Sequence, residues 1–340
     1  MEAVDRYSDR LAEPKALRTT AGVIDLGFRG HLCLLGADRA RFLHGQVTND
    51  IKKLRPGDGC YAALATAKGK MESDLNVYNL ADELLLDFEP GFADAIRQRL
   101  EKFIIADDVQ IVDAAPHYGL LSVQGPKAET VIRELGLFVD VPGRALQSIK
   151  ISEPTLGEIY LMNQPRLGTS GFDVFVPTNS LGAVMDKLIA AAKQIGGCAC
   201  GWQALETARI EAGIPRFGAD MDASNIPLEC GIESRAISYQ KGCYIGQEVI
   251  NRIHSFGHVT KELRGLRLAD DLKTLPVKGD KLFKDDKEVG NLTSAVFSPA
   301  LQANVALGYV RREFFAVGNE LTLQSAGGHT SARIVPLPFV

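Results

Sequence analysis

The eight residues from Lys241 to Glu248 place a thiol beside a cation and between two glycines, in the order Lys-Gly-Cys-Tyr-Ile-Gly-Gln-Glu. Glycines at positions 242 and 246 allow the backbone to turn sharply around Cys243. The ammonium of Lys241, two residues away, would stabilise a thiolate and so raise its reactivity. The segment predicts a reactive thiol at Cys243. A buried cysteine in a glycine-rich turn is the equally weighted alternative.

A carboxylate ends a second candidate segment. The chain is predicted to be helical from Trp202, and Gly213 and Pro215 end regular structure just after Glu211. This position beside a turn makes the carboxylate accessible to a ligand. The residues alone favour a simpler interpretation, a surface glutamate paired with a neighbouring arginine.

Cations are concentrated between positions 241 and 267. Two anions, Glu248 and Glu262, lie in the same stretch. A solvated surface is the favoured interpretation, and a patch that attracts an anionic ligand is the alternative. The five cations are Lys241, Arg252, Lys261, Arg264 and Arg267.

The elements that must position these residues alternate between helix and strand over the first 260 positions. Helical spacing predicts helices at 92–103 and 181–195, and Asp38 is a candidate N-cap for a short helix that Gly45 would end. The chain lacks the Val/Ile-rich runs of a parallel sheet, so the predicted class is α+β. Strands are predicted at 31–35, 61–66, 75–80, 84–88, 120–123, 159–162 and 172–176.

The sequence changes character after Leu263. Short strand patterns alternate with turn pairs such as Gly279-Asp280 and Gly327-Gly328, and no helical periodicity remains. We therefore predict a separate antiparallel β-barrel at the C-terminal end.

Bulk composition sets limits on the class of protein. The chain has 340 residues, 46% hydrophobic and 24% charged, with a net charge of −4. These values are typical of a globular protein of two or three domains, and the acidic balance disfavours direct nucleic-acid binding. The N-terminus is charged and no apolar run reaches the ~18 residues of a membrane helix. A cytoplasmic location without membrane association is expected.

Several common catalytic motifs are missing from the sequence. It contains no Gly-rich phosphate loop, no Gly-x-Ser-x-Gly and no His-Glu-x-x-His. In a chain of this length without a secretory signal, we expect the six cysteines to be reduced thiols. They include no Cys-x-x-Cys pair, so no metal site is expected. Cys198 and Cys200 are expected to be packing residues.

The segment from Lys241 to Glu248 resembles the signature of the YgfZ branch of the glycine-cleavage T-protein (aminomethyltransferase) superfamily. The resemblance covers the chain from Gly22 onward. Other matching stretches are Phe42-Leu43 with Thr48-Asn49-Asp50, Gly171–Val174, Leu205–Gly213 with Gly218–Asp222, and Gly290–Val310.

This resemblance implies a monomer with three domains in a ring and tetrahydrofolate, or a folate derivative, bound inside. The implied domains are an α+β unit of residues 1–50 with 140–250, an α+β unit of residues 51–139, and a β-barrel of residues 260–340. Glu211 matches the pterin-contacting glutamate, and a carboxylate accepts hydrogen bonds from the pterin amino and N3–H groups. The expected folate-binding residues are Glu211, Asp74, Lys241, Tyr244 and Arg252.

The sequence departs from the T-protein pattern at one important place. The family pattern Gly-Gly-x-x-Asp-Asp-Leu corresponds here to Gly69–Leu75, in which Ser73 replaces one acid and Asp74 keeps the other. Cys243 and Asp74 are the expected catalytic residues.

The loss of one acid favours an accessory function over catalysis. The leading hypothesis is a folate-binding factor whose partners are iron–sulfur proteins or cluster-assembly factors, including tRNA-modifying iron–sulfur enzymes. The alternative hypothesis is a tetrahydrofolate-dependent aminomethyltransferase. Direct tRNA modification is a third, which the acidic net charge opposes.

Overall fold

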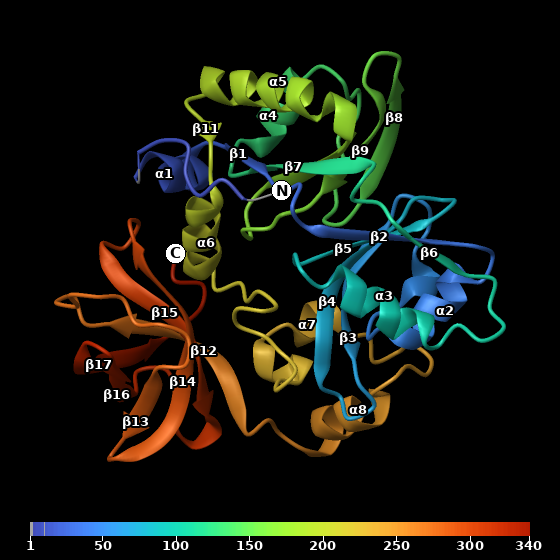
Figure 1. The fold of residues 1–340 in the computed structure, drawn as a ribbon. Coiled ribbons are helices and arrows are strands. Elements are labelled where there is room, and N and C mark those ends of the chain that lie inside the picture. The colour runs from blue at the N-terminus through green and yellow to red at the C-terminus, as the bar shows by residue number, and fades with distance from the viewer. Residues whose placement is uncertain (1–2, 10) are drawn as a thin grey trace. The chain divides into compact units, whose positions relative to one another are not determined.

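A computed structural model describes residues 3–9 and 11–340 of the chain (Figure 1). The contacts divide them into two compact units. The first contains the chain up to Ala65 together with Glu72–Leu205 and Ala236–Ile245, and the second contains Thr66–Met71, Glu206–Arg235 and Gly246–Val340.

A six-stranded sheet forms one half of the first unit. Its order is β11-β1-β7-β10-β9-β8, and neighbours are antiparallel apart from the parallel pair β1/β11. Helices α4 (Ala128–Glu134) and α5 (Leu181–Gln194) pack on it through a shared apolar core. The short helix α1 (Ala12–Thr19) contacts β1. The strands are β1 (Gly22–Asp25), β7 (Tyr118–Gln124), β8 (Ser148–Glu153), β9 (Gly157–Asn163), β10 (Gly171–Pro177) and β11 (Cys198–Ala199).

A five-stranded sheet forms the other half of this unit, in the order β3-β4-β5-β2-β6. Helices α2 (Arg39–Gln46) and α3 (Ala93–Glu101) cover one face, where Leu34, Val77 and Leu86 are buried. Because side chains alternate along a strand, residues of the other parity point to the opposite face. The strands are β2 (Gly30–Leu35), β3 (Gly59–Ala65), β4 (Met71–Asn79), β5 (Leu84–Phe88) and β6 (Gln110–Asp113).

The second unit contains a closed, fully antiparallel barrel, in the order β12-β15-β14-β13-β16-β17. Its interior is apolar, with Leu266, Leu292 and Ile334 among the fully buried residues. This barrel confirms the predicted C-terminal architecture. The strands are β12 (Lys261–Leu268), β13 (Lys281–Lys284), β14 (Lys287–Ser298), β15 (Ala303–Arg311), β16 (Glu320–Ser325) and β17 (Gly328–Val335).

Short helices occupy the part of the sequence that follows β11 and precedes β12. They are α6 (Trp202–Glu211), the 3₁₀ turn η3 (Pro227–Cys230), α7 (Glu233–Ala236) and α8 (Gln247–Phe256). α8 begins after Gly246, whose φ of 91° lies in the left-handed region that favours glycine. A Cβ at Gly246 would lie 2.6 Å from the carbonyl oxygen of Thr66, so this position has no room for a side chain.

The α+β class and the two helices predicted from periodicity, α3 and α5, are confirmed. One prediction for α2 is wrong, because Gly45 lies inside the helix and the helix ends in extended backbone at Val47. The Asp38 side chain makes no capping bond to α2. Its carboxylate accepts a hydrogen bond from the Asp108 backbone N–H at 3.0 Å instead.

The two sheets interleave along the sequence. β2, within the first 50 residues, belongs to the five-stranded sheet, and β7, within residues 51–139, belongs to the six-stranded one. The strands therefore do not follow the expected division at residues 50 and 139. The expected three-domain division itself stays a prediction.

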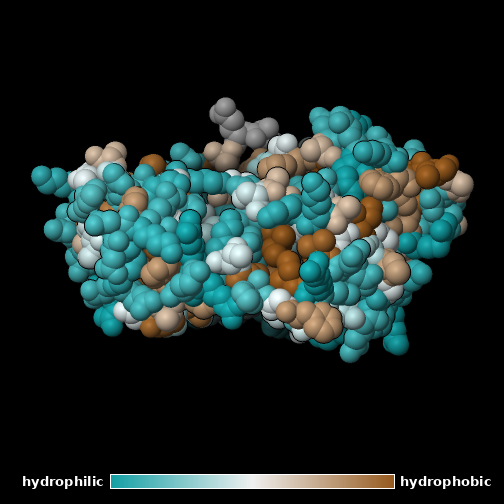
Figure 2. Space-filling view, turned by 90° about the horizontal axis from the view of Figure 1, so that it is seen from below, coloured by the Kyte–Doolittle hydropathy of each residue, from teal (hydrophilic) through white to brown (hydrophobic). Residues whose placement is uncertain are grey.

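Among the helices of the described residues, none is both long enough and apolar enough to cross a membrane. Hydrophilic side chains cover most of the face seen in Figure 2, with hydrophobic ones in limited areas. Of the described residues, Val139, Phe256 and Ile105 are the most exposed large hydrophobic side chains, each more than nine-tenths exposed.

Candidate functional site

Strand β4 carries a carboxyl group with an altered acidity. Asp74 lies on the face of the five-stranded sheet opposite α2 and α3, and its Oδ2 accepts a hydrogen bond of 2.8 Å from the Tyr61 hydroxyl on β3. Burial, and then the nearby Glu89 carboxylate, raise the pKa of Asp74 to about 6. A carboxyl with this pKa exchanges its proton near neutral pH, which is the range in which general acid–base groups are most effective.

Ser73 points to the other side of the same strand. It is fully buried and has the parity of Leu75 and Val77, which pack into the core beneath α2 and α3. Its hydroxyl donates to the backbone oxygen of Asp74 at 3.0 Å. The replacement of an acid at position 73 therefore removes no acid from the face on which Asp74 lies.

A buried ionic network follows Asp74 along this face. Asp87 on β5 binds Arg29 at 2.6 Å and Arg166 at 2.8 Å, and Arg166 also binds Asp173 at 2.5 Å. Arg29 reaches Glu89 at 2.5 Å. The two arginines hold the pKa of Asp87 well below its usual range despite its burial.

Sequence reasoning missed this network. The signal available was an aspartate within each of two otherwise apolar strands, at Asp87 and Asp173. A charge in such a strand is rarely buried without a partner. The arginines that complete the network lie far away in the sequence, so the chain order does not indicate the pairing.

Lys241, an expected folate contact, is buried and fully bonded. Its ammonium donates to three backbone oxygens around the end of α2, those of His44 at 2.5 Å, Val47 at 2.6 Å and Asn49 at 2.8 Å. An ammonium has three N–H bonds, and these carbonyls use all of them. Lys241 thus holds the α2 terminus, and the expected stabilisation of a Cys243 thiolate would have to compete with these bonds.

Cys243 and Tyr244 differ in exposure. The Cys243 thiol is exposed, which excludes the alternative of a buried cysteine, whereas Tyr244 is buried with its ring 4.8 Å from the Lys241 ammonium. Burial raises the pKa of Tyr244 to about 12. Its hydroxyl is buried and has no hydrogen-bond partner among the described residues. An unpartnered buried hydroxyl fits a site that receives a polar ligand.

Glu211, at the end of α6, lies in the second unit and is 5% exposed. Its Oε1 accepts hydrogen bonds from the Ser298 hydroxyl at 2.5 Å and from the Ala300 N–H at 3.4 Å. The interpretation as a surface glutamate paired with arginine is wrong. The neighbouring arginines, Arg209 and Arg216, bind Glu206 instead.

Asp220 gathers the polar groups of the second unit. Its carboxylate accepts hydrogen bonds from Arg209 at 2.7 Å, Thr293 at 2.6 Å and Ser294 at 2.7 Å, and from the Arg216 N–H at 3.1 Å. These bonds tie α6 to strand β14. Asp220 therefore has a structural role within the second unit.

The cations between 241 and 267 do not form one solvated run. In the second unit, Arg264 binds Glu262 at 2.5 Å and the Phe315 backbone oxygen at 3.1 Å. The Lys261 ammonium lies 4.7 Å from the Tyr309 ring centroid. Arg252 on α8 is exposed, so it remains available to an anionic ligand.

Comparison with known protein families decides the membership of the chain. Residues 3–241 match the GCVT N-terminal domain, and residues 261–340 match the glycine cleavage T-protein C-terminal barrel domain. The chain belongs to the glycine-cleavage T-protein family. This membership confirms the superfamily expected from the sequence. The matching family models do not assign the chain to the YgfZ branch.

Curated relatives of this T-protein family member are named aminomethyltransferases. The enzyme of Geobacillus kaustophilus is 28% identical over 335 residues, which cover 98% of this chain and 91% of the relative. The enzyme of Halalkalibacterium halodurans is 29% identical over 341 residues, covering 98% and 90%. A solved aminomethyltransferase T from Bartonella henselae has the same fold, with a TM-score of 0.85 over 97% of this chain and 89% of its own, at 23% identity.

These relatives correct the leading functional hypothesis. The sequence favoured an accessory factor for iron–sulfur enzymes, but the full-length curated relatives are named for aminomethyl transfer. The position of Ser73 explains the error in physical terms. Its identity was taken as the loss of a reactive acid, and the side chain lies in the core on the other face of β4.

Proposed function

We propose that this chain is an aminomethyltransferase that transfers a one-carbon group to tetrahydrofolate. We base this proposal on Asp74, whose carboxyl group has a pKa near 6 and accepts a hydrogen bond from the Tyr61 hydroxyl. Full-length similarity to named aminomethyltransferases supports the same reaction. Tetrahydrofolate is the cofactor that the T-protein family uses, so the folate cofactor expected from the sequence is confirmed.

Each of the two units, taken by itself, has polar groups that suit a folate. Asp74 offers a carboxyl group with one described side-chain donor, and Tyr244 offers an unpartnered buried hydroxyl. Glu211 accepts both of its described side-chain hydrogen bonds at Oε1, which leaves Oε2 for a pterin N–H. When bound, tetrahydrofolate supplies the nitrogen that accepts the one-carbon group.

The protein's own contribution is proton handling. In its ionised form Asp74 would accept at Oδ1 the proton lost by the nitrogen that receives the one-carbon group, while the Tyr61 hydroxyl holds Oδ2 in place. A pKa near 6 leaves most of the carboxyl ionised at pH 7 and still basic enough to take the proton. The five-stranded sheet fixes the position of the carboxyl, because Asp74 lies within β4 and not in a loop.

An assay with the purified chain tests this proposal. Supplied with tetrahydrofolate and an aminomethyl donor, the wild type should form the folate-bound one-carbon product. Asp74→Asn should lower the rate by about 10²–10⁴-fold, the usual contribution of a positioned acid–base group. The limb near pH 6 in the wild-type pH–rate profile should be missing in the variant.

Asp94→Asn is the matched control, because Asp94 is an aspartate on α3 whose side chain is 81% exposed. This variant should retain the wild-type rate. A wild type that binds folate and forms no product would disprove the transferase proposal. A fully active Asp74→Asn variant would remove Asp74 from the mechanism.

We also propose the other site residues, the cellular location and the oligomeric state that were expected from the sequence. Cys243, Tyr244 and Arg252 are retained as proposed site residues, Cys243 on its exposure and Arg252 on its accessible charge. Lys241 is proposed to hold the end of α2 and not to contact folate, since backbone carbonyls use its three N–H bonds. A cytoplasmic location is proposed from the sequence, and a monomer is proposed from the family resemblance. The YgfZ branch is proposed from the Lys241–Glu248 motif alone, as a statement about sequence relationship and not about function.

A further inference from the structure

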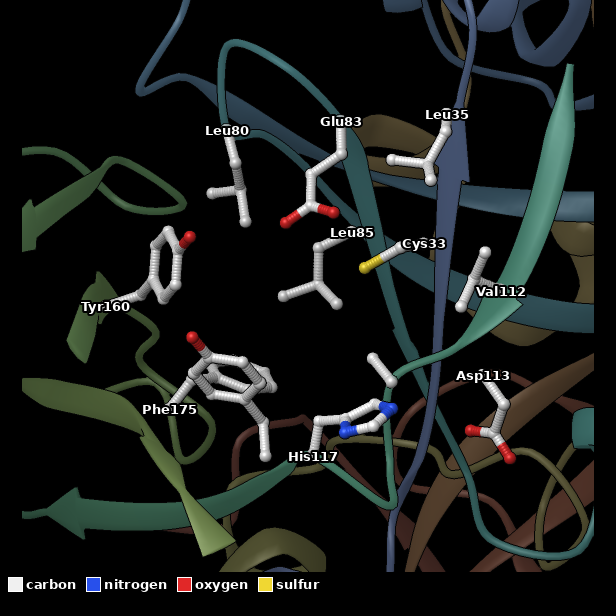
Figure 3. Close-up of a pocket in the computed structure, with 12 residues that line it drawn as sticks. Cys33, Leu35, Leu80, Glu83, Leu85, Val112, Asp113, His117, Tyr160 and Phe175 are labelled. Atoms are coloured by element: carbon white, nitrogen blue, oxygen red, sulfur yellow. The ribbon is translucent and has the colours of Figure 1, made fainter. Parts of the chain in front are cut away.

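A cavity of about 220 Å³ lies between the two sheets of the first unit (Figure 3). The five-stranded sheet contributes Cys33, Leu85 and Val112, and the six-stranded sheet contributes Tyr160 and Phe175. An apolar cavity of roughly 150 Å³ is enough to hold benzene. This cavity therefore has room for one ring with a short chain.

The ionisable side chains that line the cavity are two carboxylates, a thiol, two tyrosine hydroxyls and the imidazole of His117. The Glu83 carboxylate points toward the middle, as do the side chains of Cys33 and Leu85 (Figure 3). None of the twelve lining residues is a lysine or an arginine. The other lining acid, Asp113, directs its carboxylate away from the middle, and it accepts a hydrogen bond of 3.0 Å from the Ala115 N–H.

Two tyrosines line the cavity together with Glu83. Tyr118 and Tyr160 pack edge to face with their centroids 5.9 Å apart, and both line the cavity. Burial and the charges of Glu158 and Glu83 raise the pKa of Tyr118, so the negative field reaches this part of the cavity. The Lys150 ammonium lies 5.8 Å from the Tyr160 ring centroid, and a carboxylate near such aromatic rings is the combination that attracts an organic cation.

The cavity is separate from the proposed transferase site. On the sheet face that carries Asp74, Cys33 pairs with Leu85 and the next pair on that face is His31 with Asp87. Asn76, on the same face of β4, hydrogen-bonds to Asp87 at 2.9 Å. The buried ionic network thus lies between Asp74 and the cavity.

We propose that this cavity binds a small organic ammonium ion with one aromatic or branched apolar body. The body fills the space between Leu85 and Phe175, and the ammonium group binds the Glu83 carboxylate against the tyrosine rings. This site makes no use of folate or of Asp74, so it stands independently of the proposed reaction.

Calorimetry with three probes of similar shape tests the charge requirement. The probes are 2-phenylethylammonium, neutral 2-phenylethanol and anionic 3-phenylpropionate. The wild type should bind the cation roughly ten- to a hundredfold more tightly than the alcohol, as a hydrogen bond to a charged group provides. The anion should bind most weakly, and a crystal soaked with the cation should show it in the cavity.

Glu83→Gln should remove the preference for the cation while the alcohol still binds. Asp82→Asn is the matched control, since Asp82 is the neighbouring acid in the same turn, is exposed, and does not line the cavity. It should bind all three probes as the wild type does. Equal binding of cation and alcohol by the wild type, or no binding of any probe, would overturn the proposal.

Discussion

At the scale of single residues, protonation of Asp74 affects both the proposed reaction and the stability of the folded protein. Its pKa rises from 3.8 to about 6 in the folded protein because of burial. Between pH ~4 and ~6 the folded state binds more protons than the unfolded chain, so stability falls as pH rises through this window and stays lower above it. A shift of this size corresponds to up to about 3 kcal/mol.

Asp74→Asn should therefore be more stable than the wild type at pH 8, by up to about 3 kcal/mol, even though its transfer rate should be lower. The gain should shrink on acidification and be lost below pH ~4. Urea unfolding at several pH values measures it. An identical pH dependence in both proteins would show that Asp74 titrates normally.

Glu211 has a structural bond that must be separated from its proposed ligand contact. Glu211→Gln should weaken folate binding about five- to a hundredfold, because it removes a charged acceptor. Ser298→Ala removes the 2.5 Å bond and leaves the carboxylate in place. If calorimetry shows equal losses in both variants, Glu211 acts only by holding the structure.

Because the Cys243 thiol is exposed, we expect an alkylating reagent to modify it before the other cysteines. Brief alkylation of the native protein should label Cys243 first, because Cys33, Cys200 and Cys230 are buried. Cys198 is the nearest competitor, since a hydrogen bond from Cys200 lowers its pKa. Mass mapping that finds Cys198 modified ahead of Cys243 would contradict the proposed role of Cys243.

At the scale of elements, Lys241 holds the end of α2 through three carbonyl oxygens. Lys241→Met keeps an unbranched side chain that is one atom shorter and leaves these acceptors without their donor, so it should destabilise the protein by about 2–5 kcal/mol. Lys53→Met, at a lysine whose side chain is 66% exposed, should change stability by less than about 0.5 kcal/mol. Denaturant unfolding of both variants measures the loss of stability and shows whether Lys241 stabilises the end of α2 or behaves as an ordinary surface lysine.

The same elements show how far sequence reasoning extends. The periodicity of α3 and α5 and the turn signals of the barrel are local, and they predicted the observed helices and strands. The short strand β1 and the edge strands β6 and β8 were missed, since their four to six residues form mainly through tertiary pairing.

The candidate site was only partly predictable, for a related reason. Family motifs predicted that Asp74 and Glu211 belong to the site. Their positions in the sequence do not show which residues hydrogen-bond to them. Tyr61 and Ser298 join them across 13 and 87 residues. The face of β4 on which Ser73 lies was readable from the alternation with Leu75 and Val77.

At the scale of the whole molecule, the proposed function predicts the defect of a cell that lacks this protein. Glycine-dependent one-carbon production should fall, and activities of iron–sulfur enzymes should stay near normal. A plasmid copy of the wild type should restore the production, and an Asp74→Asn copy should not. The opposite pattern, with iron–sulfur enzymes impaired and one-carbon production normal, would reject the transferase.

The closure of the barrel has a consequence for biosynthesis. Its first strand, β12, and its last, β17, meet along four paired positions, from Gly265 with Val335 to Leu268 with Ala332. While the ribosome is still adding β17, the nascent sheet has two open edges that other chains can join. The barrel cannot close until β17 has emerged, so translational pausing or premature termination before Val335 should leave an aggregation-prone chain, and chaperone demand should concentrate in this final interval of synthesis.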